Sequence, residues 1–101
     1  MTKEVQKDDI IDFIATHRDE LVRAYGVRKI GLFGSYARGD VREDSDIDIV
    51  VELEKPDLFY LIGIKQTFEG AFRKKVDIVR LRDTMNIVLK QRLQQDAIYM
   101  E

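Results

Sequence analysis

The sequence predicts an α/β fold, in which helices pack against a small mixed β-sheet. Its 101 residues fit one domain, spanning residues 1–101, and leave no room for a second. Helical and strand-like patterns alternate along the chain, which favours a sheet covered by helices. Apolar residues make up 45% of the chain and charged residues 36%, a balance typical of folded proteins rather than disordered ones.

The chain is expected to begin with a long helix and a short strand. Apolar residues recur at helical spacing over residues 8–25, where Asp8 or Asp9 can cap the start of the helix and Gly26 can end it. Residues 27–34, VRKIGLFG, are typical of a short buried strand that runs into a glycine turn. These two segments predict the first helix and the first strand.

Two further strands and two further helices are expected after a polar stretch. Residues 35–45 have room for a short helix, and residues 46–53, DIDIVVEL, alternate between apolar and polar side chains as a strand does. A second long helix begins after Pro56, and residues 74–81 form a third strand. Thr84 can cap the last helix. The apolar stripes of these two helices comprise Leu58, Leu61, Ile64, Phe68 and Phe72, and then Met85, Leu89, Leu93 and Ala97.

Composition argues against several classes of protein. The formal net charge is -2, which gives no strong electrostatic footprint for duplex DNA or an anionic membrane, so binding to nucleic acid is not indicated. Cysteine is absent, which excludes a disulfide framework and a thiolate metal site. No apolar run approaches the ~20 residues of a membrane span, and the N-terminus has no apolar signal region. We therefore expect a cytoplasmic protein.

Gly34 and Ser35 directly follow the first predicted strand. Glycine lets the backbone approach a ligand closely, and free N–H groups at the start of a helix favour an anion. The serine hydroxyl adds a donor, so the pair can hold a phosphate group. An ordinary strand-to-helix turn with a serine cap explains the pair at least as well when it is taken alone, because short glycine motifs are weak evidence.

Asp46 and Asp48 lie two residues apart on the second predicted strand, so both carboxylates point to one face. Two carboxylates about 5 Å apart at an effective dielectric near 20 repel each other by roughly 3 kcal/mol. A divalent cation removes that repulsion, and a set of oxygen ligands favours Mg²⁺ or Mn²⁺ over zinc. The alternative is a solvated strand face that carries surface acids.

Asp77 stands alone on the polar side of the third predicted strand. Alone it fits a surface residue or half of an ion pair with its basic neighbours. If this strand lies beside the second one, Asp77 completes a cluster of three carboxylates suited to two metal ions about 3.5–4 Å apart. Asp46 and Asp48 would then bridge the ions, and Asp77 would bind the ion at the nucleophile and help to remove its proton.

These motifs together resemble the signature of a known superfamily. Gly34-Ser35, ten further residues and Asp46-Ile47-Asp48 resemble the signature of the DNA polymerase β-like nucleotidyltransferases. The surrounding run, GLFGSYARGDVREDSDIDIVVE, is similar to the minimal nucleotidyltransferase (MNT) branch. That branch supplies the antitoxin of toxin–antitoxin modules whose toxin is a HEPN-domain ribonuclease. The resemblance covers most of the chain.

The resemblance implies a role for each matching position. Gly34 and Ser35 would hold the triphosphate of ATP, the nucleotide donor. Arg38 lies in an Ala-Arg-Gly stretch that the branch also carries and would contact phosphate, although a solvated or salt-bridged arginine fits equally well. The residues expected to hold Mg²⁺, or Mn²⁺, and to carry out catalysis are Asp46, Asp48 and Asp77.

The function implied is that of an enzyme, which transfers AMP from ATP to a macromolecular hydroxyl, here a tyrosine of a HEPN toxin. Larger relatives add a domain that binds the acceptor, which we expect this chain to lack. A docked macromolecule or a second subunit would therefore complete the site in a homo- or hetero-oligomer. The last helix and an aromatic group could offer the interface, with core packing as the alternative; the group comprises Phe59, Tyr60, Phe68 and Phe72.

Two other functions stay open. The chain could be an antitoxin that neutralises its toxin by contact, with little or no catalysis. It could also transfer a nucleotide to a small molecule such as an aminoglycoside, although the expected lack of an acceptor domain argues against this.

Overall fold

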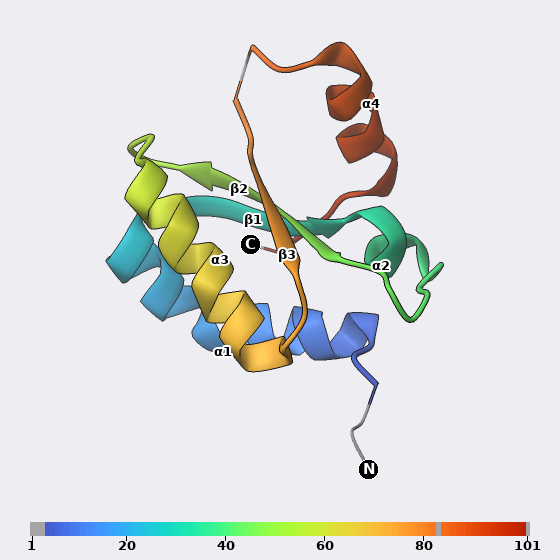
Figure 1. Cartoon of the computed structure of the whole chain (residues 1–101). Helices are drawn as coiled ribbons and strands as arrows, with labels where there is room; N and C mark the ends of the chain where they lie inside the picture. Colours follow the sequence, from blue (N-terminus) through green and yellow to red (C-terminus); the bar gives the residue numbers. More distant parts are fainter. Residues whose placement is uncertain (1–3, 83, 101) are drawn as a thin grey trace.

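The computed structural model describes residues 4–82 and 84–100 (Figure 1). The elements follow the predicted order, with one more strand at the end. They are α1 (Lys7–Tyr25), β1 (Val27–Phe33), α2 (Gly34–Arg38), β2 (Ile47–Leu53), α3 (Leu58–Phe72), β3 (Val76–Arg80), α4 (Ile87–Asp96) and β4 (Ile98–Met100). The α/β prediction is therefore confirmed.

The four strands form one mixed sheet in the order β3-β2-β1-β4. β1 pairs antiparallel with both β2 and β4, whereas β2 and β3 are parallel. The third strand thus lies beside the second, as the site prediction required. Asp48 and Asp77 are direct partners across this parallel pair.

One face of the sheet carries the main core. Figure 1 shows α1 and α3 together on this face, below the sheet in that view. In line with the alternation predicted for residues 46–53, Ile47, Ile49 and Val51 of β2 point to this side and are fully buried. Their buried partners from the other elements include Ile10, Ile14 and Leu21 of α1, Ile30 and Leu32 of β1, and Ile64 and Phe68 of α3.

The opposite face carries a smaller cluster under α4, which lies above the sheet in Figure 1. Its buried members are Phe33, Val50 and Leu93. Successive residues of a strand point to opposite faces, so Asp48, two residues before Val50, points to this side as well. Asp77, the strand partner of Asp48, shares that face. The predicted carboxylates therefore lie on the side of the sheet that α4 only partly covers.

The helices α1 and α4 both differ from the prediction in the residue that caps their N-terminus. α1 has Gln6 in the cap position, and Asp9 acts from inside the first turn, where its Oδ2 accepts a hydrogen bond from the Gln6 N–H at 2.9 Å. Neither aspartate is therefore the cap itself. Gly26 ends α1 with a φ of 65°, as predicted.

The cap of α4 is Asn86, so the prediction of Thr84 was wrong. The Asn86 Oδ1 accepts hydrogen bonds from the N–H groups of Val88 and Leu89 at 2.9 and 3.3 Å. Asparagine binds the first free N–H groups of a helix at least as well as threonine does. The cap therefore lies two residues later than predicted.

β4 was not predicted, because its three residues are too few to show a strand period. Ala97 had been assigned to the last helix, but it is the residue that ends α4, in an extended conformation. The Tyr99 ring lies against Gly31 of β1, where a Cβ atom would come within 2.7 Å of the ring. In the apolar stripe of α3, Leu58 is exposed, whereas Ile64 and Phe68 are buried as predicted.

Within the described parts of the chain, none of the helices combines the length and the apolar character needed to cross a bilayer.

Candidate active site

The turn from β1 into α2 brings Gly34 against Asp48. Gly34 has a φ of 73°, in the left-handed region that disfavours residues with a side chain. A Cβ atom at this position would also overlap Oδ2 of Asp48. Only glycine therefore satisfies the turn and the close approach together, and two motifs found separately in the sequence meet at one point.

The short helix α2 presents Ser35 and Arg38 to a cavity. Tyr36, between them, is buried in the main core and fixes the helix to it. The cavity has a volume of about 270 Å³. The lining residues are Phe33, Gly34, Ser35, Arg38, Asp48, Arg92 and Asp96. Four predicted site residues thus line one cavity, and the first N–H groups of α2 lack partners within the helix.

Asp48 is the electrostatic centre of the three predicted carboxylates. Partial burial, reinforced by the charges of Asp77 and then Asp46, raises the pKa of Asp48 to about 6, while Arg38 acts in the opposite direction. Asp77 lies beside Asp48 across the strand pair, and Asp46 comes directly before β2. The negative charges of the three side chains therefore act on one another.

Asp46 and Asp77 do not line the cavity itself. Asp46 Oδ2 lies 3.8 Å from Nζ of Lys75, in an exposed ion pair. Within residues 4–82 and 84–100, no three Asp, Glu, His or Cys side chains form a ready-made metal site. The structure thus brings Asp46 and Asp77 near Asp48 in the sheet, but the three carboxylates do not form a ready-made metal site.

The donor set nevertheless fits a divalent cation of the Mg²⁺ type. Asp46, Asp48 and Asp77 offer only oxygen atoms, which such cations prefer. Burial, and then the charges of Asp77 and Asp46, raise the pKa of Asp48, and a cation would relieve the repulsion between these charges. If a metal binds, these three residues are the ones that would hold it.

Arg92 and Asp96 of α4 line the same cavity and were missed by sequence reasoning. Asp96 Oδ2 accepts a hydrogen bond from Nη1 of Arg38 at 3.0 Å, across 58 positions of sequence. Arg38 is thus salt-bridged, one of the two interpretations that the sequence left open. Arg92 and Asp96 are four residues apart on the last helix, which was a signal of a shared face but not of what that face meets.

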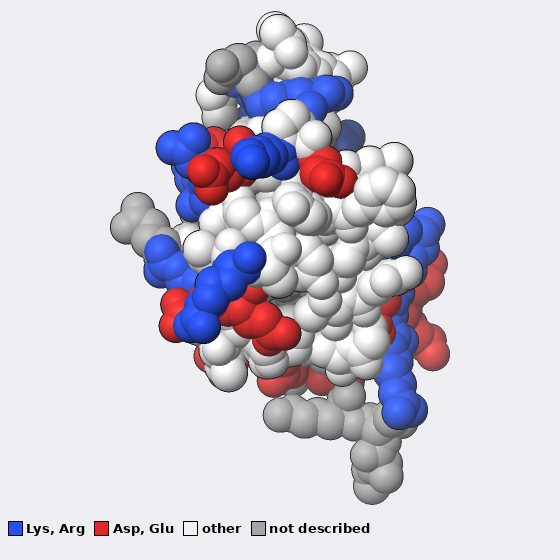
Figure 2. Space-filling view, turned by 90° about the vertical axis from the view of Figure 1, so that its left-hand side faces the viewer, with Lys and Arg blue, Asp and Glu red and all other residues white. Residues whose placement is uncertain are grey.

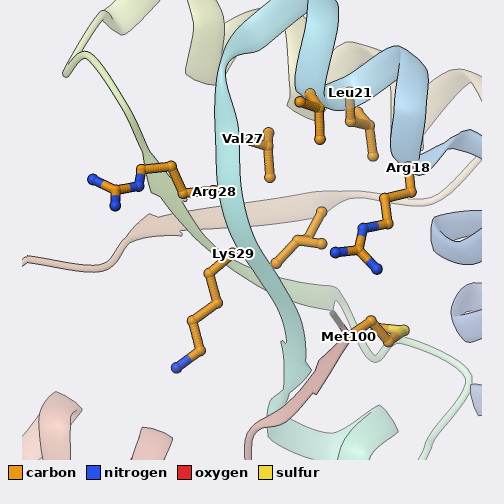
Figure 3. Close-up of a pocket in the computed structure, with 8 residues that line it drawn as sticks. Arg18, Leu21, Val27, Arg28, Lys29 and Met100 are labelled. Atoms are coloured by element: carbon orange, nitrogen blue, oxygen red, sulfur yellow. The ribbon is translucent and has the colours of Figure 1, made fainter.

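A second, smaller cavity lies between the C-terminal half of α1 and β1 (Figure 3). Its volume is about 30 Å³, which is room for a water molecule and far too little for a nucleotide. In Figure 3 the side chains of Arg28 and Lys29 extend away from Leu21 and Val27. This cavity is therefore a packing defect beside the core rather than a candidate site.

Comparisons with known proteins show which family the chain belongs to. The sequence model described as "Polymerase beta, Nucleotidyltransferase" matches residues 6–100. The protein adenylyltransferase MntA of Thermococcus cleftensis is 33% identical over 94 residues, which cover 92% of this chain and 94% of that relative.

Two solved structures have the same fold. A minimal nucleotidyltransferase is similar with a TM-score of 0.77 and 28% identity, over 96% of this chain and 98% of that one. An MNT antitoxin in complex with a tri-AMPylated HEPN toxin of Shewanella oneidensis is similar with a TM-score of 0.60 and 26% identity, over 87% of this chain and 69% of the matched one. The family resemblance in the sequence is thereby confirmed, and the chain belongs to the polymerase beta nucleotidyltransferase family.

Proposed function

We propose that the chain is a protein adenylyltransferase, which transfers AMP from ATP to a tyrosine hydroxyl of a HEPN-type toxin and so acts as an antitoxin. The observation that carries the proposal is the meeting of Gly34 with Asp48, whose strand partner is Asp77. The turn proposed to bind phosphate thus lies beside a set of carboxylates. A relative named as a protein adenylyltransferase supports the type of reaction, and the complex with an AMPylated HEPN toxin supports the acceptor.

In the proposed reaction the tyrosine oxygen attacks the α-phosphorus of ATP. A bond forms between that oxygen and the phosphorus, the bond from the α-phosphorus to the bridging oxygen breaks, and pyrophosphate leaves. Asp77 accepts the hydroxyl proton. Bound Mg²⁺, held by Asp46, Asp48 and Asp77, would neutralise the charge that develops on the phosphate oxygens.

The turn before α2 has the positioning role in this proposal. Gly34 allows the triphosphate to approach the backbone, and the first N–H groups of α2 together with the Ser35 hydroxyl donate hydrogen bonds to it. Arg38 adds a positive charge at the same cavity. Holding the α-phosphorus in line with the attacking oxygen supplies much of the rate enhancement in reactions of this kind.

The test is transfer of label from α-phosphate-labelled ATP to a candidate HEPN toxin in the presence of Mg²⁺. We expect labelled toxin with the parent and none with Asp46→Asn/Asp48→Asn. Asp44→Asn is the matched control, because it removes an exposed carboxylate from the loop just before the site. Equal labelling by the parent and the double variant would rule out carboxylate-dependent transfer.

A second candidate function is neutralisation of the toxin by contact, and an exposed apolar face favours it. Figure 2 views the molecule from the left-hand side of Figure 1, where α3 and the end of α1 lie, and shows a broad area without charged side chains. On α3, Phe59 is 80% exposed, Leu58 is 69% exposed and Ile62 is also exposed. Exposed apolar groups of this kind often mark protein contacts.

The aromatic group for which the sequence left an interface and core packing open is therefore divided. Phe68 is fully buried and belongs to the core, which is the alternative that the sequence had left open for this group. Tyr60 and Phe72 are partly buried against the same core, and only Phe59 is largely exposed.

A protection assay in cells that express the toxin distinguishes the two functions. If transfer is the mechanism, Asp48→Asn leaves the complex intact but no longer protects the cells. If contact alone is the mechanism, Asp48→Asn protects as well as the parent does.

A further inference from the structure

The cavity at the candidate site has two walls, and only one of them belongs to the recognised motif. Gly34, Ser35 and Arg38 come from the turn and the short helix after β1. Arg92 and Asp96 come from α4, one helical turn apart. Figure 1 shows α4 above the sheet and α2 at its right-hand end.

Packing fixes the α4 wall in place. Leu93, which follows Arg92 directly, is 3% exposed and packs with Phe33 and Val50 on the sheet. Because side chains three and four residues apart share a face of a helix, Leu89 lies on the same packed side, and Arg92 and Asp96 share the neighbouring face. That neighbouring face is the one that borders the cavity.

Arg38 and Arg92 differ in whether their guanidinium group has a partner. The Arg38 guanidinium is bound by Asp96, whose side chain is 19% exposed, against 47% for that of Arg38. Arg92 forms no hydrogen bond or ion pair within the part of the chain that the structure describes, although it lines the same cavity. Of the two cations at the cavity, one is held in position and the other is open to a ligand.

The charges of the cavity define the ligand. Its lining holds two guanidinium groups, Arg38 and Arg92, and two carboxylates, Asp48 and Asp96. Asp96 is already paired, and Asp48 faces Asp77. The unpaired guanidinium of Arg92 therefore suits a phosphate group, to which arginine can donate two parallel hydrogen bonds.

We propose that α4 supplies the second half of the triphosphate site, and this rests on the proposed function. Arg92 binds phosphate oxygens of the nucleotide, opposite Gly34 and Ser35. Asp96 is a positioning residue, which holds the Arg38 guanidinium at the cavity so that it meets the same triphosphate. The site thus depends on a helix that lies outside the Gly-Ser and Asp-Ile-Asp motifs.

The role of Arg92 is tested by calorimetry of ATP and of inorganic tripolyphosphate, each with Mg²⁺. We expect Arg92→Ala to weaken both ligands by roughly 10-fold to 100-fold, which is the effect of losing charge-assisted hydrogen bonds, and Arg92→Lys to recover part of the loss. Lys90→Ala removes the same charge from an exposed position of α4 outside the cavity and should leave both affinities unchanged.

The outcomes separate the two proposals. A parent protein that binds neither ATP nor tripolyphosphate overturns the proposed function, and the role of α4 with it. A parent that binds both, with equal affinity in Arg92→Ala, overturns the role of Arg92 alone. Loss of ATP affinity without loss of tripolyphosphate affinity also overturns it, because Arg92 would then act on the nucleoside.

Asp96 is tested by a double-mutant cycle with Arg38, measured as ATP affinity. We expect Asp96→Ala to weaken ATP binding by roughly 3-fold to 10-fold in the parent and to have no further effect in Arg38→Ala, as a coupled pair does. A purely structural role would lower ATP affinity equally in both backgrounds and would overturn the positioning role. Thermal unfolding without nucleotide shows whether each variant is folded.

Discussion

Asp48 is less stable as a carboxylate in the folded chain than in the unfolded one. Burial and the charges of Asp77 and Asp46 raise the pKa of Asp48 from 3.8 to about 6. Between these two pH values the folded state binds more protons than the unfolded state, so stability falls as the pH rises. The contribution of Asp48 to the free energy of unfolding is therefore most favourable below pH 3.8 and is lost by about pH 6.

Asp48→Asn should consequently stabilise the metal-free protein at pH 7. The full shift corresponds to about 3 kcal/mol, but partial exposure of Asp48 screens it, so we expect a gain of about 1 kcal/mol. Urea unfolding in the presence of EDTA, at pH 7 and at pH 4, measures this gain in unfolding free energy. The gain should be smaller at pH 4. Asp44→Asn, at an exposed site, should change little. A gain that is the same at both pH values would contradict the electrostatic origin.

Gly34 gives a second prediction. Gly34→Ala places a Cβ atom at a φ of 73° and against the Asp48 carboxylate, so we expect a loss of about 2 kcal/mol in unfolding free energy and of ATP affinity. Gly70→Ala is the control, because a Cβ atom there meets open space on α3. It should stabilise the chain by up to about 1 kcal/mol. Unchanged ATP affinity in Gly34→Ala would show that nucleotide does not use this turn.

The site residues that could be predicted from the sequence belong mainly to motifs whose members lie close together in the chain. Gly34, Ser35 and the Asp-Ile-Asp run lie close together in the chain, so their spacing is visible. Arg92 and Asp96 reach the site only because α4 folds over the sheet, and the Arg38–Asp96 contact spans 58 positions. A contact of that kind depends on tertiary packing and leaves no local pattern.

Helices and strands could be predicted where the periodic pattern of apolar residues extends over many residues. α1, α3 and β2 repeat their buried positions often enough to fix type and orientation. The three residues of β4 are too few for that. The start of α4 was predicted at Thr84, but Asn86, which caps helices equally well, lies two residues later and is the cap. Leu58 looked like part of a buried stripe, but the first turn of α3 extends past the core.

α4 depends on few buried contacts, and Leu93 is its buried residue. Leu93→Ala should therefore lower the unfolding free energy by about 2–4 kcal/mol and loosen α4 from the sheet. Because Arg92 and Asp96 are on this helix, ATP affinity should fall as well. Leu93→Met, which keeps the volume, is the control and should retain both properties within about 1.5 kcal/mol. Full ATP affinity in a folded Leu93→Ala protein would argue against the α4 wall.

At the scale of the whole molecule, the exposed apolar face and the candidate site are on different sides of the sheet. α3 covers the face with the main core, whereas Asp48, Asp77 and α4 share the other. Binding of a toxin through α3 and binding of nucleotide should therefore be separable by substitution.

Phe59→Ser/Ile62→Ser tests this separation. We expect it to weaken the complex with the toxin by at least 10-fold, because each exposed apolar side chain buried in an interface contributes about 1 kcal/mol or more. Its ATP affinity and thermal stability should equal those of the parent. Pull-down and calorimetry measure both. Ile87→Ser, at an exposed apolar position of α4, is the control, and an equal loss there would show that the contact is not confined to α3.

The parallel pairing of β2 with β3 also determines where the chain tolerates insertions and deletions. Deleting one residue within Val76–Arg80 would shift the strand by one position and turn the carboxylate of Asp77 towards the main core. The exposed residues between Gly39 and Ser45 have no such constraint, since even doubling a flexible loop costs only about 0.6 kcal/mol. The loop after Gly39, which forms the second half of the ten-residue interval in the motif, is therefore physically freer to change in length than the five residues of β3.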